Sequence, residues 1–140
     1  MKNRLGIALV ALVAVAVVGI VVFRKASTPQ SRKDGVYQGE FHNEEKGSST
    51  RVTLKMRGGK IVDCQMTALD AEGHVKDENY GKNSGAENYR RAQLAVEGMQ
   101  QYPEMLLKMQ DVDTMDAVSG ATVTFKEFQA AVRRALKEAK

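Results

Sequence analysis

The chain has 140 residues, which is enough for one folded domain and a flanking segment. Its formal net charge of +4 arises near the N-terminus, because four of the 21 Lys and Arg residues flank an apolar run there and all 17 acidic residues follow that run. The rest of the chain is formally neutral and has no basic stripe interleaved with aromatic residues. Nucleic-acid-binding domains have such a stripe, so we expect no nucleic-acid partner.

The apolar run covers residues 5–23 and contains no charged or strongly polar side chain. At about 1.5 Å per residue, a helix of this length nearly spans a hydrocarbon core. A cleaved signal peptide, the alternative, has a shorter apolar region and ends at a small-residue cleavage site. Here the run ends at two basic residues. We therefore predict an uncleaved membrane anchor over residues 1–25 and a polar linker over 26–33.

Three segments alternate between apolar and polar residues and predict β-strands over 35–41, 50–57 and 60–69. Gly58-Gly59 is a hairpin signal between the second and third segments. In the third strand, the residues predicted to face inward are Val62, Cys64, Met66 and Ala68. Three antiparallel strands with one apolar face need helices to cover that face.

Two Ser/Thr-x-x-Glu spacings predict capping boxes at helix starts. Ser84 with Glu87 predicts a helix that runs to about residue 99, and Thr124 with Glu127 predicts the start of the last helix. A short helix between them has Pro103 in its first turn and Leu106 and Met109 facing inward. The apolar stripe of the last helix comprises Phe125, Phe128, Val132, Ala135 and Leu136.

These elements predict an α+β fold, in which an antiparallel sheet is covered by helices and is preceded by one N-terminal transmembrane helix. The folded domain would occupy residues 34–140.

Candidate sites in the predicted loops and strands are weak. Cys64 lies in an apolar alternation and is interpreted as a buried, inert thiol. His42 and His74 have no partners at metal-binding spacing, and the acidic residues near position 75 do not have the spacing of a calcium loop, so we expect no metal site. Tyr80 and Tyr89 flank a Gly/Asn-rich loop, where either could stack on a planar ring or simply pack.

The segment 116–124 is the one that organises the predicted chemistry. Thr122 lies just outside the predicted start of the last helix, where free backbone N–H groups and the helix dipole favour a phosphate. Gly120 and Ala121 leave room for a bulky group to approach the backbone. These residues alone fit either a phosphate-bearing ligand beside Thr122 or an ordinary turn before a capped helix.

The spacing Asp116-x-x-Ser119-Gly120-Ala121-Thr122 resembles the flavinylation motif of the FMN-binding domain family. That family includes subunits of the Rnf and sodium-translocating NADH:quinone oxidoreductase complexes. The resemblance implies that Thr122 carries FMN through a phosphodiester, installed by an FAD-using flavin transferase. It implies that the other four motif residues belong to the same site. Asp116 would orient Thr122, cap the turn or be recognised by the transferase.

The resemblance extends over roughly residues 34–138, from the Asp34-Gly35-Val36-Tyr37 opening to the closing helix. It departs at Phe125, where many members have Ser, but this position lies after the acceptor. The run Ser84-Gly85-Ala86-Glu87 looks similar, yet its fourth residue has no hydroxyl to esterify.

The resemblance also implies a location and a role. Members of the family work outside the cytoplasmic membrane, so we expect a single-pass membrane protein with an extracytoplasmic domain. It would be an electron carrier rather than an enzyme with its own organic substrate, and it would exchange electrons with membrane or extracytoplasmic redox partners. The alternatives are an electron-feeding subunit of an extracytoplasmic reductase and an anchored binding module with a vacant Thr122.

Overall fold

The computed structural model describes residues 32–140. The predicted anchor and most of the predicted linker lie outside the described residues. Within the described range, no helix has the length and apolar character needed to cross a membrane. The elements in chain order are β1 (Gly35–His42), β2 (Ser49–Arg57), β3 (Lys60–Leu69), α1 (Ala86–Met99), α2 (Tyr102–Met109), a short 3-10 helix η1 (Val112–Thr114) and α3 (Thr122–Glu138).

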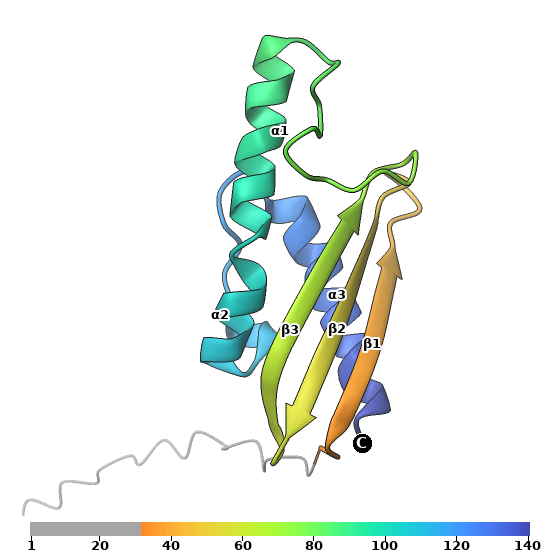
Figure 1. Cartoon of the computed structure of the whole chain (residues 1–140), viewed down its shortest axis with the longest axis vertical. Helices are drawn as coiled ribbons and strands as arrows, with labels where there is room; N and C mark the ends of the chain where they lie inside the picture. Colours follow the sequence, from red (N-terminus) through yellow and green to blue (C-terminus); the bar gives the residue numbers. More distant parts are fainter. Residues whose placement is uncertain (1–31) are drawn as a thin grey trace, which may run out of the picture.

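The three strands form one antiparallel sheet in the order β1-β2-β3, so the predicted α+β fold with an antiparallel sheet is confirmed. Helix α3 lies across β1 and β2, while α2 packs against β3 (Figure 1). The period of two in β2 places Val52 and Leu54 on the covered face, where both are fully buried. The opposite face is polar and carries the ion pair between Arg51 and Glu40 at 3.0 Å.

The predicted orientation of β3 is wrong at its start. Val62 is 45% exposed, and Ile61 is buried in its place. The cause is a shift in the β2–β3 register between Lys55 and Met56, which adds a residue to β3 and reverses the alternation locally. The other residues predicted to face inward are buried or half-buried: Cys64, Met66 and Ala68.

The two long helices lie where the sequence predicts them, but neither predicted capping box forms. Helix α1 begins after Gly85 without a side-chain cap, and Glu87 instead pairs with two arginines of its own helix. Helix α3 begins at Thr122 after the N-cap residue Ala121, two residues before the predicted start. Thr124 is therefore inside the first turn of α3 rather than its cap.

The predicted apolar stripe of α3 is confirmed, and its members pack in or against the core: Phe125, Phe128, Val132, Ala135 and Leu136. In α2, Leu106 is fully buried as predicted, but Met109 is 42% exposed. The next residue, Gln110, turns into the left-handed region at φ 60°. Its side chain reaches the edge of β3 instead, bonding both the N–H and the C=O of Ile61 at 2.8 Å.

The backbone of α3 lies directly on β1 at Gly39. A Cβ at this position would be 1.9 Å from the carbonyl oxygen of Ala131 and 2.6 Å from the nitrogen of Ala135. No side chain fits in that space, so the glycine permits the close approach. This contact sets the position of α3 on the sheet and thereby the place of its N-terminus.

Gly39→Ala is expected to lower the free energy of unfolding by roughly 1–3 kcal/mol or to prevent folding, because the added methyl group meets helix backbone that cannot move aside. Urea denaturation followed by circular dichroism measures the change. Gln38→Ala, at the exposed neighbouring position, is the control and should leave the midpoint nearly unchanged. Equal midpoints for both variants would contradict this description of the contact.

Candidate functional site

The predicted site residues lie on the turn that leads into α3. The Ala121 N–H donates to the Val118 carbonyl at 3.0 Å, and the Ala121 carbonyl in turn accepts from the Phe125 N–H at 2.9 Å. Gly120, which lies between Val118 and Ala121 in the turn, has φ 86°, a left-handed conformation that favours glycine. Thr122 follows as the first residue of α3, and it is exposed.

The hydroxyl of Thr122 therefore lies at the N-terminal end of a helix. The N–H groups of the first helical turn have no carbonyl partner within the helix, and no side chain caps this end. These N–H groups, together with the positive end of the helix dipole, favour an anion. A phosphate ester on the Thr122 oxygen would thus be attached directly beside suitable backbone donors.

Asp116 and Ser119 are also exposed. No side chain caps the N-terminus of α3. Recognition by a second protein is compatible with the exposure of both residues.

Tyr102, the first residue of α2, closes this turn from the inside. Its hydroxyl donates to the Ala121 carbonyl and accepts from the Val118 N–H, each at 3.1 Å. Its fully buried ring packs on Phe125 and Phe128, with centroids 5.0 and 5.7 Å away. Burial raises the pKa of the Tyr102 hydroxyl, and the hydrogen bond from Val118 opposes that rise. Nothing in the sequence pattern indicates this contact, since Tyr102 precedes Pro103 far from the motif.

A cavity of about 370 Å³ opens beside the N-terminus of α3. That volume falls within the range of small-ligand sites. Its lining includes Ala121, Val123 and Thr124 from the turn and helix, and Val96 and Met99 from α1. The loops after β1 and β3 complete it with polar and charged residues: Lys46, Ser48, Asp70, Glu72, Lys76 and Tyr80. The cavity thus combines an apolar wall with a charged rim. The residues on either side of Thr122 line it, but Thr122 itself does not.

The two tyrosines that the sequence leaves open as ring partners have different surroundings. Tyr80 lines the cavity, and the Lys76 ammonium lies 5.8 Å from its ring centroid. Burial raises the pKa of Tyr80, and nearby carboxylates add to the rise. Tyr89 donates its hydroxyl to the Glu78 carbonyl at 2.7 Å and is not part of the lining. Tyr80 is therefore the tyrosine available to a ring held beside Thr122.

Glu127, predicted as half of a capping box, is a buried acceptor instead. It is 1% exposed and receives three neutral donors. Ser48 donates at 2.6 Å and Asn43 at 3.1 Å to one carboxylate oxygen, and Thr50 donates at 2.9 Å to the other. These bonds tie the loop after β1 and the start of β2 to α3, and Ser48 also lines the cavity. Glu127 thereby fixes one wall of the cavity.

The remaining candidate residues do not assemble into another site. Cys64 is buried, as predicted, and burial, with a smaller effect from Asp63, raises the pKa of its thiol to about 12. The Nδ1 atom of His74, on an exposed loop, lies 3.5 Å from the Oδ2 atom of Asp70. Among residues 32–140, no three His, Cys, Asp or Glu side chains are grouped so that they could hold a metal ion.

Residues 8–137 match the family model described as the FMN-binding domain. The chain belongs to the FMN-binding domain family. It is therefore a flavin-binding protein, as the S-G-A-T resemblance predicts. A search of curated proteins gives no match.

Two solved structures are similar to this FMN-binding domain. A crystal structure of a protein from Clostridium perfringens has a TM-score of 0.57 at 22% identity, and the alignment covers 77% of this chain and 88% of that chain. This likeness shows the shared fold. A solution NMR structure of a protein from Clostridium thermocellum has a TM-score of 0.46 at 26% identity and covers 77% of this chain and 92% of that one.

The described residues fit FMN in their chemistry. The uncapped N-terminus of α3 suits the phosphate, and the apolar wall formed by Val96 and Met99 suits a planar ring. Tyr80 contributes an aromatic ring to the lining, and the rim carries both signs of charge, with Lys46 and Lys76 beside Asp70 and Glu72. The motif indicates Thr122, but the sequence pattern gives no sign of the cavity, because its lining comes from four separate segments.

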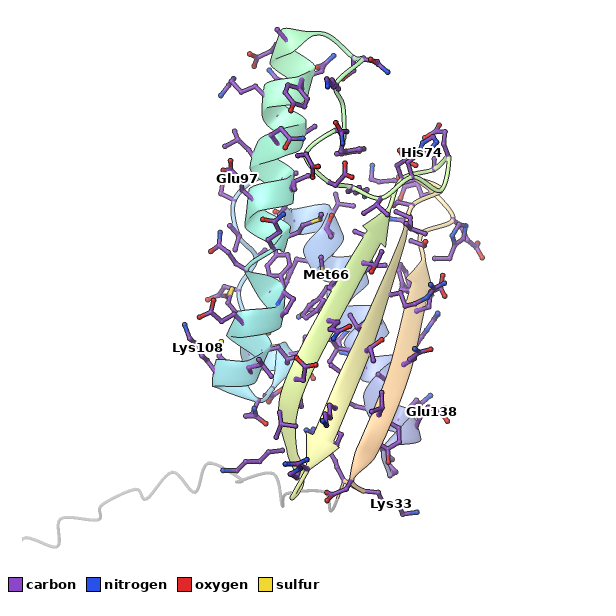
Figure 2. The ribbon with its side chains drawn as sticks, in the orientation of Figure 1. Lys33, Met66, His74, Glu97, Lys108 and Glu138 are labelled. Carbon is purple, nitrogen blue, oxygen red and sulfur yellow. The ribbon has the colours of Figure 1, made fainter. Side chains whose placement is uncertain are left out.

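Glu127→Ala is expected to lower the free energy of unfolding by roughly 1–3 kcal/mol or more, because it leaves three donors without an acceptor. Glu127→Gln should cost less, since the Thr50 hydroxyl can rotate to accept from the new amide. Chemical denaturation measures both. Glu97→Ala is the matched control, because Glu97 lies exposed on the outer side of α1 (Figure 2). If the two alanine variants lose equal stability, Glu127 does not hold the loop to α3.

Proposed function

We propose that this protein is an electron carrier whose FMN is attached to Thr122 by a phosphodiester. The observation that carries the proposal is the exposed residue Thr122 at an uncapped helix N-terminus, where its neighbours Ala121 and Val123 line a cavity of about 370 Å³. Membership of the FMN-binding domain family supports the cofactor, and the Asp116-x-x-Ser-Gly-Ala-Thr spacing supports the covalent link.

Attachment requires a second enzyme, an FAD-using flavin transferase. The Thr122 oxygen forms a bond to the phosphorus of the FMN half of FAD as the pyrophosphate bond breaks. AMP leaves, and the hydroxyl proton passes to the transferase or to water. No electrons are exchanged in this step. Exposure of Thr122 and its neighbours Ser119 and Gly120 gives such an enzyme access to the acceptor.

The phosphodiester keeps one negative charge, which the N–H groups of the first turn of α3 would stabilise. Such interactions contribute roughly 0.3–1 kcal/mol at exposed sites. The isoalloxazine ring of the flavin would lie in the cavity beside Tyr80 and Met99. The flavin supplies one- or two-electron chemistry, while the protein supplies placement and tuning.

A covalent link suits a small domain with an open cavity. The described part of the chain offers limited surface in which to bury a large cofactor, and a dissociable flavin outside the cell would be lost by dilution. A bonded flavin can keep its reactive edge accessible. Electron-transfer partners then need only small, short-lived interfaces.

We also propose that residues 1–25 anchor the domain on the outer face of the cytoplasmic membrane, since the run over 5–23 is apolar throughout. The Lys33 N–H donates to the Ala139 carbonyl at 2.8 Å, so the chain enters the domain beside the C-terminus of α3. Thr122 lies at the other end of this 17-residue helix, about 25 Å away. Figure 2 likewise shows Lys33 and Glu138 at one end and His74, in the loop after β3, at the other. The flavin would thus face away from the anchor, toward redox partners.

When the protein is co-produced with a flavin transferase, Thr122→Ala should abolish the covalent flavin, because the variant has no oxygen to esterify. Ser119→Ala should retain part of it and is the matched control within the motif. In-gel flavin fluorescence under denaturing conditions provides the measurement. A fluorescent Thr122→Ala band would show that the acceptor is misassigned. A dark wild-type band would favour the alternative of a binding module with a vacant Thr122.

Tyr80→Ala should change the fluorescence yield per attached flavin, because it removes the aromatic side chain that lines the cavity. Tyr89→Ala is the control, since Tyr89 lies outside the lining. Both proteins are brought to equal flavin occupancy by absorbance before emission is compared. If only Tyr89→Ala alters the emission, the ring does not occupy this cavity.

A further inference from the structure

The turn that presents Thr122 has little side-chain packing of its own. Ser119 and Gly120 are exposed, and the nearest atoms to a Cβ placed on Gly120 would be 3.9 Å away on Leu94. The conformation of the turn must therefore be held at its ends, at Val118 and Ala121.

The Ala121 N–H donates to the Val118 carbonyl at 3.0 Å, and in addition both ends bond to one atom, the hydroxyl oxygen of Tyr102. It accepts a hydrogen bond from the Val118 N–H and donates one to the Ala121 carbonyl, each at 3.1 Å. The phenol ring is 0% exposed and is fixed against Phe125 and Phe128, so the oxygen cannot follow a displaced turn. The hydroxyl thus serves as a fixed point for both ends of the turn.

The neighbouring helix reinforces this arrangement. Gly98 of α1 lies so close that a Cβ on it would be 2.9 Å from the Ala121 Cβ and 3.2 Å from a Val118 methyl group. The turn therefore has α1 on one side and the Tyr102 hydroxyl between its ends. Ala121 is also the N-cap residue of α3, so the conformation of the turn determines how Thr122 leaves it.

The geometry points to Tyr102 as a positioning residue for flavin attachment, one that acts on Thr122 through the 118–121 turn. This inference rests on the proposed function, because it concerns transfer of FMN to Thr122. Without the hydroxyl, the turn would spend part of its time in conformations that the transferase cannot use. A binding-competent fraction below one raises the apparent dissociation constant in inverse proportion.

The test is the steady-state rate of FMN transfer from FAD to the full chain, with the concentration of the unmodified protein varied. For Tyr102→Phe, the KM for this protein should rise about fivefold or more, the scale expected for losing a hydrogen bond of ordinary strength, while kcat stays within about twofold. Tyr89→Phe, which also loses a hydroxyl that donates to a backbone carbonyl, should match the wild type. A purely structural role would leave both constants unchanged well below the melting temperature.

Amide hydrogen exchange on the unmodified full chain gives a readout that needs no flavin. The Val118 amide should be protected in the wild type relative to Ser119 and should exchange faster in Tyr102→Phe. If Val118 exchanges as fast as Ser119 in folded wild-type protein, the inference is overturned, even if the Tyr102→Phe variant fails to fold.

Flavin attachment to Thr122 and the positioning role of Tyr102 can be tested separately. Wild-type protein that accepts no FMN overturns the proposed function and, with it, the role of Tyr102. Wild-type protein that is modified normally, with an unchanged KM in Tyr102→Phe, overturns only the role of Tyr102.

Discussion

The backbone of α3 rests directly on β1 at Gly39, and the placement of the site depends on this contact. A Cβ there would lie 1.9 Å from the Ala131 carbonyl oxygen, so the strand and the helix approach as closely as backbone allows. A helix seated in this way has a fixed axis, and its first residue projects at a defined place. That residue is Thr122. It lies at the opposite end of α3 from Lys33, which bonds to Ala139 just before the sheet begins.

Two polar contacts then hold the N-terminal half of α3. Glu127 receives donors from the loop after β1, which keeps that loop beside the helix and forms one wall of the cavity. Tyr102 bridges the ends of the preceding turn from α2. Each is buried, so each group would be costly to leave unpaired. Their combined effect is that the exposed Thr122 lies at the start of a helix that is held at both its turn and its first half.

The sequence predicts the parts of this structure that local patterns control. Alternation in β2 and the Gly58-Gly59 turn give the sheet, and the stripe containing Phe128 and Val132 gives α3. Long-range partners control the rest. Glu127 has the spacing of a capping box but bonds to a distant loop. Val62 turns outward because the register shifts at Met56, a feature of the β2 partner strand. The local motif indicates Thr122. In contrast, Tyr80 lines the cavity and Tyr102 bonds the turn only because tertiary packing brings them there.

A flavin bonded to Thr122 would lie at the end of the domain opposite Lys33. The most direct test is mass spectrometry of full-length protein co-produced with a flavin transferase. We expect the tryptic peptide over residues 109–126 to gain the mass of FMN less one water, and fragmentation to place the addition on Thr122. An unmodified peptide under these conditions, or an adduct on another residue of the peptide, would contradict it.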